Sequence, residues 1–221
     1  MPYGLNLISP PAIEPVSLDQ AKSFCTVSRG FTDDDQLISG LISAARQVAE
    51  TYIKRSIFNQ SWLLTLDNFP LFWGRSTVKN IAESSFPYSY FFEGVTRKLP
   101  RPHCVSVTSI QYLDVNGDSQ TLSSSNYVLD TNSEPARLIP APNYYWPTAT
   151  VYIPGSVQIE FVSGTWGDGV EVNTCPQNVV TAISLLTAHF YGNREGAAPI
   201  PDAFYRLLDS VRFTSFGFSN Y

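Results

Sequence analysis

Cysteine is scarce in this chain of 221 residues, and its three copies suggest no cross-link. Cys25, Cys104 and Cys175 lie far apart, are odd in number and form no C-x-x-C pair. This pattern excludes a disulfide framework and offers no zinc-ligand spacing. We expect all three to be small buried residues in a reducing cell. A chain of this length can bury a stable core without disulfides or metal.

Long apolar runs are also missing, since none approaches the ~20 residues that a membrane-spanning helix needs. The first residues lack the basic region that opens a signal peptide. We therefore expect a soluble protein that is made in the cytoplasm and has no membrane partner.

Charge is low, with 15% charged residues, a net charge of −5 and no basic run. Tight wrapping of nucleic acid is excluded because it requires clustered Lys and Arg. Aromatic residues reach 14%. Interface cores are depleted of charge and enriched in aromatics, so this composition indicates a surface covered by partners. An aromatic-rich β core explains the composition equally well.

Catalytic and metal-binding signatures are absent as well. His103 and His189 are the only histidines, and His189 shares a helical face with Leu185 and Leu186, which favours a packing role. There is no G-x-S-x-G and no H-E-x-x-H. We predict that the protein is not an enzyme and has no catalytic residues, metal site or cofactor.

Three short motifs resemble functional sites but have simpler explanations. Residues 114–118 look like a calcium loop but lack its later Glu and flanking helices, so a hairpin turn at Asn116-Gly117 is favoured. Residues 164–169 are rich in glycine without G-x-G-x-x-G spacing, which favours a turn. Asp33-Asp34-Asp35 place negative charge at a helix start.

The first part of the chain predicts an extended arm followed by two helices. Prolines in residues 1–16 argue against regular structure there. The capping box Ser17-Leu18-Asp19-Gln20 predicts a short helix to about Cys25. Apolar residues at spacings of three and four then predict a long amphipathic helix from the aspartates to about Lys54. Its packing stripe comprises Leu37, Leu41, Ala45, Val48 and Tyr52.

The middle and the end of the chain predict strands and then helices again. Strand-like alternation begins at Ser61, and helix returns at Cys175-Pro176 with Pro at the first helical position. The stripe of this helix comprises Val179, Ile183, Leu186 and Phe190, and a shorter helix is expected from Asp202 to Asp209. The fold class is therefore α+β: helices of residues 17–60 and 173–212 pack as a small bundle, and residues 61–172 form an inserted antiparallel β-domain.

Two aromatic clusters lie where loops are usually polar. Within the long loop or insertion of residues 74–98 are Phe86, Tyr88, Tyr90, Phe91 and Phe92. The tail of residues 213–221 carries Phe213, Phe216, Phe218 and Tyr221. Exposed clusters of this kind mark interaction sites. The alternative is that both fold back on their own domain.

An ordered set of motifs resembles the head–tail connector (adaptor) family of tailed bacteriophages and gene transfer agents. The resemblance covers most of residues 15–212 and departs at 74–98 and after Arg212. In chain order the matching segments are Pro15–Lys22, Asp33–Ile38, Ala44–Arg46, Gln60–Asp67, Phe69-Pro70, Leu99–Pro102, Ser106–Tyr112, Ala136–Leu138, Trp146-Pro147, Gly155–Val157, Gly164, Cys175-Pro176 and His189–Glu195.

The resemblance implies a homo-oligomeric ring, commonly of twelve subunits, built by the helical stripes. Such a ring docks beneath the portal protein after DNA packaging and offers a platform to a tail-side neck protein, a stopper or tail completion protein. Viral DNA then passes through the channel without sequence-specific binding. The protein would sit in the virion neck after synthesis in the bacterial host cytoplasm.

Family members grip the portal with the C-terminal segment. Carried over to this chain, the portal-binding residues are Asp202, Tyr205, Arg206, Phe213, Phe216, Phe218 and Tyr221. The aromatic loop at 86–92 would contact a further partner. A rival hypothesis is a carbohydrate-binding or adhesin-type β module of a virion, with Tyr144, Tyr145 and Trp146 as a sugar platform. A small hydrolase would need an acid–base site that the sequence does not show.

Overall fold

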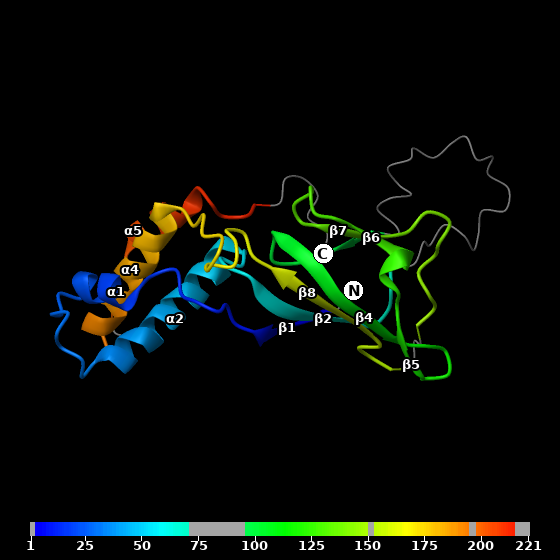
Figure 1. Cartoon of the computed structure of the whole chain (residues 1–221), viewed down its shortest axis with the longest axis horizontal. Coiled ribbons are helices and arrows are strands. Elements are labelled where there is room, and N and C mark those ends of the chain that lie inside the picture. The colour runs from blue at the N-terminus through cyan, green and yellow to red at the C-terminus, as the bar shows by residue number, and fades with distance from the viewer. Residues whose placement is uncertain (1–2, 71–95, 150–152, 195–197, 215–221) are drawn as a thin grey trace. The chain divides into compact units, whose positions relative to one another are not determined.

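The computed structural model describes residues 3–70, 96–149, 153–194 and 198–214 (Figure 1). The chain forms two compact units. Among the described residues, the β unit comprises those up to Ser9 and those within Gln60–Ser163, and the helical unit comprises Pro10–Asn59 and those after Ser163. The predicted α+β class, with terminal helices and an inserted antiparallel β-domain, is confirmed.

The helical unit contains four α-helices within the described residues. They are α1 (Leu18–Phe24), α2 (Asp35–Ile53), α4 (Gln177–Gly192) and α5 (Asp202–Asp209). The capping box is present, because Gln20 N donates to Ser17 Oγ over 3.3 Å and Ser17 N donates to Gln20 Oε1 over 3.1 Å. Pro176 is the N-cap of α4, one position earlier than predicted. Helix α2 packs against α4, as expected for the predicted bundle of residues 17–60 and 173–212.

The core of the helical unit lies along a face of α2 that differs slightly from the predicted stripe. Ile38, Ile42, Ala45, Ala49 and Ile53 are buried there. Of the predicted α2 stripe, Ala45 is in the core, Val48 and Tyr52 pack at its margin, Leu41 is half-buried and Leu37 is 39% exposed. The bundle core therefore does not account for Leu37, and its role in ring packing stays a prediction. On α4, Val179, Ile183 and Leu186 are buried and Phe190 is half-buried.

The β unit contains two antiparallel sheets. The first has the strand order β1 (Tyr3–Ser9), β2 (Gln60–Leu66), β8 (Val157–Ser163), β4 (Cys104–Leu113) and β5 (Ser119–Thr121). The second has the order β3 (Arg97–Lys98), β7 (Arg137–Pro140) and β6 (Tyr127–Asp130), and a 3₁₀ turn at Ser124–Asn126 precedes β6. Burial alternates along β2 and β8, so one face of the first sheet is covered by the core.

The expectation that prolines exclude regular structure from residues 1–16 is wrong for β1. This strand pairs with β2 from Tyr3 opposite Leu66 to Leu7 opposite Trp62. Pro10 and Pro11 follow the strand, so they remove no donor from its ladder. Those prolines lie in the helical unit instead.

The hairpin at Asn116-Gly117 is confirmed, but its loop is longer than the two-residue type I′ turn that an Asn-Gly pair favours. Leu113 pairs with Ser119, which leaves five residues in the loop, and Gly117 adopts a φ of 88°. Asp114 Oδ1 accepts hydrogen bonds from the backbone N of Asn116 over 2.8 Å and of Asp118 over 3.1 Å. The carboxylate therefore organises the longer loop by bonding to its backbone.

The cysteines behave as buried thiols. Cys25 and Cys104 are buried and Cys175 is half-buried, and all three are free. Burial raises the pKa of the Cys104 thiol and of the Cys175 thiol to about 12, so both stay protonated at neutral pH. None of the helices in the described ranges is long and apolar enough to cross a membrane.

Candidate interaction site on the helical unit

The predicted portal-binding residues that the structure describes lie on α5 and in the segment after it. Asp202, Tyr205 and Arg206 are on α5, and Phe213 follows the helix. Phe216, Phe218 and Tyr221 lie outside the described residues, as do Phe86, Tyr88, Tyr90, Phe91 and Phe92 of the predicted partner-contact loop. A candidate site can therefore be built around α5 and the chain that leaves it.

Helix α5 has one buried face and one exposed face. Phe204 and Leu208, four residues apart, are fully buried and anchor the helix to the core of the helical unit. Asp202 and Arg206, also four residues apart, are exposed. Tyr205 lies between these faces and meets Tyr52 of α2 edge to face, with ring centroids 5.0 Å apart. The two buried anchors thus fix which side chains of α5 are exposed.

The segment after α5 is fastened to the C-terminal end of α2. The backbone N–H of Phe213 donates to the carbonyl of Ile53 over 2.9 Å, which satisfies one of the carbonyls left unpaired at a helix end. Arg55 Nε donates to the carbonyl of Val211 over 3.2 Å. The Arg55 guanidinium carbon lies 5.5 Å from the centroid of the Phe213 ring. Three contacts therefore define the place from which the tail continues.

Tyr52 connects α2 with both α5 and this segment. Its hydroxyl donates to Asp209 Oδ1, and the Arg212 guanidinium carbon lies 4.7 Å from its ring centroid. The hydrogen bond to Asp209 is the largest cause of a raised Tyr52 pKa, so the phenol keeps its proton and goes on donating at neutral pH. Asp209 therefore holds the Tyr52 hydroxyl, and the Arg212 guanidinium covers one face of the Tyr52 ring.

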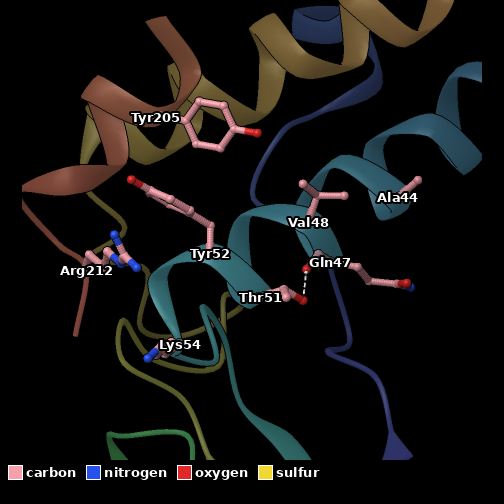
Figure 2. Close-up of a pocket in the computed structure, with 8 residues that line it drawn as sticks. All are labelled: Ala44, Gln47, Val48, Thr51, Tyr52, Lys54, Tyr205 and Arg212. Carbon is pink, nitrogen blue, oxygen red and sulfur yellow. Dashed lines mark hydrogen bonds between the residues drawn. The ribbon is translucent and has the colours of Figure 1, made fainter. Parts of the chain in front are cut away.

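Beside Tyr52 the helical unit has a surface pocket of about 660 Å³ between α2 and α5 (Figure 2). Its lining residues are Ala44, Gln47, Val48, Thr51 and Tyr52 of α2, Lys54 just after that helix, Tyr205 of α5, and Arg212. Thr51 Oγ1 donates to the Gln47 carbonyl over 2.8 Å, shown as the dashed line in Figure 2.

The chemistry of this pocket suits a ligand group that is apolar at one end and anionic at the other. Ala44 and Val48 are apolar, and the two tyrosine rings form an aromatic wall (Figure 2). Lys54 and Arg212 bring positive charge, and no lining residue is acidic. A carboxylate that enters beside these cations would form charge-assisted contacts.

Sequence reasoning identified Val48, Tyr52 and Tyr205 but missed the pocket. Ala44, Gln47 and Thr51 lie beside the predicted stripe, and Lys54 is predicted only as the approximate end of the helix. The sequence does carry a signal for this pocket. Small and apolar residues of α2, such as Ala44 and Val48, extend beyond the face that the core buries. The sequence around Arg212 does not indicate that this residue lines the pocket, because Arg212 reaches α2 only through the folding of distant parts of the chain.

No group of three or more His, Cys, Asp or Glu residues within the described ranges could hold a metal ion. His189 Nε2 lies 3.3 Å from the carbonyl oxygen of Ala198, and the histidine carbonyl accepts a hydrogen bond from Asn193 Nδ2 over 2.9 Å. His103 is 41% exposed, and its Nδ1 lies 4.0 Å from Glu134 Oε1. These contacts fit histidines that stabilise local structure.

The predicted sugar platform is not assembled as a flat exposed surface. The Trp146 ring stacks on Phe69, with centroids 5.1 Å apart and planes 7° apart, and it is only 8% exposed. Tyr144 is half-buried, while Tyr145 is 71% exposed. A sugar would therefore find one open ring rather than three, which weakens the carbohydrate-binding alternative.

Comparisons with known proteins give matches only among solved structures. No family model matches the chain, and no curated protein does. A chain in a structure of the neck of an empty gene transfer agent (GTA) particle, computed with C6 symmetry, has a TM-score of 0.70 at 18% identity. A chain in the virion of a native GTA particle has a TM-score of 0.67 at 20% identity.

A third similar chain belongs to the neck of a native GTA particle computed with C12 symmetry, with a TM-score of 0.63 at 19% identity. In all three cases the alignment covers 98% of this chain and 98% of the other chain. At this level of identity the similarity shows a shared fold over both units.

Proposed function

We propose that this chain is a structural adaptor of a virion neck, which forms a ring under the portal and connects the DNA-filled head to the tail. The observation that carries the proposal is the near-complete match to chains of GTA necks, at 98% coverage in both directions. A match of that extent includes the helical unit, the β unit and their order in the chain. The motif resemblance to head–tail adaptors supports the same role independently.

The proposed assembly is a ring of twelve copies. The symmetries used for the two GTA necks, C6 and C12, are both compatible with twelve subunits. A closed ring uses the same two unlike surfaces on every subunit. The low charge and high aromatic content of this chain suit a protein with much of its surface in such contacts.

Portal contact is assigned to α5 and the C-terminal segment. Asp202 and Arg206 are exposed side by side on α5, and Phe213 fixes the point from which the following residues extend. The tail aromatics Phe216, Phe218 and Tyr221 are proposed as anchors. A stopper or tail completion protein would bind the opposite side of the ring, and DNA would cross the channel without sequence-specific contacts.

The proposal is tested by a pull-down on the portal protein of the same virus. Deletion of residues 214–221 retains Phe213 and its bond to Ile53, so the helical unit should stay folded. We expect the wild type to bind the portal and the deletion variant to lose most of that binding. A matched control carries Gln120→Ala on the exposed edge strand β5 and should bind normally.

Negative-stain imaging of the wild type with the portal should show a ring on the portal end. Equal portal binding by the deletion variant would remove the assignment of the tail. Absence of any ring on the portal would contradict the adaptor role itself.

A further inference from the structure

The helical unit offers a second exposed feature that complements the α2–α5 pocket. The loop between α1 and α2 presents Phe31, which is 43% exposed, and the exposed carboxylate of Asp33. Phe24 at the end of α1 and Leu37 at the start of α2 are 46% and 39% exposed. These apolar side chains lie near an acidic helix start, whereas the pocket is apolar with cations beside it.

A buried lysine holds this loop in one shape. Lys22 is 2% exposed, and its Nζ donates to the carbonyl of Phe31 over 2.8 Å and to the carbonyl of Arg29 over 3.4 Å. The same ammonium group forms an ion pair with Asp35. A loop that is already ordered loses little entropy when it binds. Phe31 is therefore presented on a preorganised support.

The exposed charge of the loop is negative, whereas the charged residues that line the pocket are positive. In the loop, Asp34 accepts a hydrogen bond from the Tyr191 hydroxyl over 2.6 Å and pairs with Arg194, whereas Asp33 is exposed. At the pocket, Asp209 is engaged by Tyr52, and Lys54 and Arg212 supply the lining charge. Contact between the two surfaces would bring a carboxylate to two cations with few other acids near them.

The spacing of the groups is compatible with this contact, because the length of the side chains covers a difference of about 2 Å between the two Cα separations. Phe31 and Asp33 are two residues apart, which allows at most about 7 Å between their Cα atoms. In the pocket, Val48 and Lys54 are six residues apart along or just past α2, a rise of about 9 Å. An aromatic ring over Ala44 and Val48 and a carboxylate beside Lys54 can thus be supplied by one short loop.

A subunit cannot use its own loop for this purpose. The loop precedes α2 and the pocket lies around its C-terminal half, and α2 has 19 residues, or about 28 Å of helix. Two complementary surfaces at opposite ends of one rigid element join copies head to tail. Repeated contacts of this kind close into a ring when the rotation between neighbours allows it.

We propose that the α2–α5 pocket receives Phe31 and Asp33 of a neighbouring copy and so forms the contact between subunits. This inference rests on the ring of the proposed function and names the surfaces that build it. The phenylalanine ring occupies the apolar part of the pocket, and the Asp33 carboxylate lies beside Lys54 and Arg212. Every copy contributes one loop and one pocket.

Charge reversal on the full-length chain tests the pairing. The loop variant carries Asp33→Lys, and the pocket variant carries Lys54→Glu with Arg212→Glu. Sedimentation velocity at low salt, up to millimolar concentration, measures self-association of each variant alone and of their equimolar mixture. A Lys98→Glu variant, reversed at an exposed position of the β unit, is the matched control. Thermal unfolding confirms that each variant folds.

We expect the wild type and the control to associate with increasing concentration. Each reversed variant alone should associate at least about tenfold more weakly, because like charges then face each other. In the mixture, the reversed loop meets the reversed pocket and the native loop meets the native pocket, so alternating copies should regain association.

Three results on self-association would each overturn the inference. They are a wild type that stays monomeric at every concentration, single variants that associate normally, and a mixture that fails to recover. A pocket variant that associates normally but loses the portal would also overturn it, by assigning the pocket to the portal. If the wild type binds the portal but charge reversal does not change self-association, the loop–pocket contact is wrong and the adaptor role stands. If charge reversal changes self-association as expected but the wild type binds no portal, the adaptor role is wrong and the loop–pocket contact stands.

Discussion

Arg46 donates from Nη1 to Glu50 Oε2 over 2.9 Å, one turn along α2, and both side chains are almost completely buried. Arg46 Nε also donates to Glu14 Oε2 over 2.7 Å, and Glu50 Oε1 accepts from the backbone N of Ile57 over 2.8 Å. These bonds connect three segments of the helical unit: the chain before α1, α2 itself and the turn that follows α2.

Loss of the arginine from this network should strongly destabilise the helical unit. Arg46→Met removes the arginine from its buried ion pair with Glu50, and breaking a buried pair from one side costs about 3–5 kcal/mol of unfolding free energy. The double variant Arg46→Met/Glu50→Gln keeps an acceptor for the Ile57 N–H without the charge, so it should be more stable than the single variant. Urea unfolding measures both. The control Lys98→Met changes an exposed cation and should cost little. An Arg46→Met variant within 1 kcal/mol of the wild type would contradict the prediction.

Asp168 should make the stability of the helical unit depend on pH. Its Oδ1 accepts hydrogen bonds from the backbone N of Val172, Val170 and Glu171, over 2.9, 2.9 and 3.0 Å. These bonds, that of Val172 first, lower the pKa of the Asp168 carboxyl in the folded state. The group therefore contributes stability that is complete above its unfolded pKa of about 3.9 and is lost as the pH falls through the lower folded value.

We accordingly expect Asp168→Asn to lower the melting temperature at pH 7 and to have less effect at a pH below the folded pKa of Asp168. Thermal unfolding of both proteins across this pH range measures the difference. Asp118→Asn removes one exposed charge from the β4–β5 loop and controls for the change in net charge. A melting-temperature difference that is equal at both ends of the range would exclude the proposed role of the carboxylate.

Features set by neighbouring residues and the bundling of the terminal helices could be predicted from the sequence, whereas the particular pairings between distant segments could not. The capping box at Ser17 and Gln20 depends on residues three apart, and α5 has the predicted bounds. By contrast, β1 exists because it pairs with β2, more than fifty residues later. Its own sequence looked like an arm because prolines follow it. The pairing could not be read from that segment alone.

The same reason explains the missed parts of the candidate site. Tyr52 meets Asp209 across a sequence separation of 157 residues. Arg46 and Glu50 lie on the buried side of α2, where helical spacing alone favours apolar residues. Hydrogen bonds to Glu14 and from the Ile57 N–H, both from outside α2, help to make their burial favourable.

Two glycines should respond to alanine in opposite directions. A Cβ on Gly164 would lie 2.6 Å from the backbone N of Asn59 and 2.8 Å from its Cα, so backbone must move and the cost should be about 1–3 kcal/mol. A Cβ on Gly40 of α2 meets nothing within 4 Å. Gly40→Ala should therefore stabilise the protein by about 0.5–1 kcal/mol, because alanine is the better helix former. Urea unfolding gives both signs, and a Gly164→Ala variant as stable as the wild type would contradict the close approach.

Arg55 should control how firmly the C-terminal segment is held. Its hydrogen bond to the Val211 carbonyl and its position over the Phe213 ring flank the bond between the Phe213 N–H and the Ile53 carbonyl. Arg55→Ala removes both contacts, and a loss of about 1.4 kcal/mol corresponds to a tenfold rise in local opening. Hydrogen exchange should therefore show about tenfold faster exchange of the Phe213 amide.

The Leu186 amide in the buried part of α4 is an internal control. It should keep its protection, because the variant is expected to loosen only the C-terminal segment and not to unfold the helical unit. Arg55→Lys retains a cation near the ring but not the guanidinium donor, so its exchange rate should lie between the other two. Because the segment is held at the end of α2, the effect should stay local. Equal exchange of Phe213 in Arg55→Ala and the wild type would show that the bond to Ile53 holds the segment without Arg55.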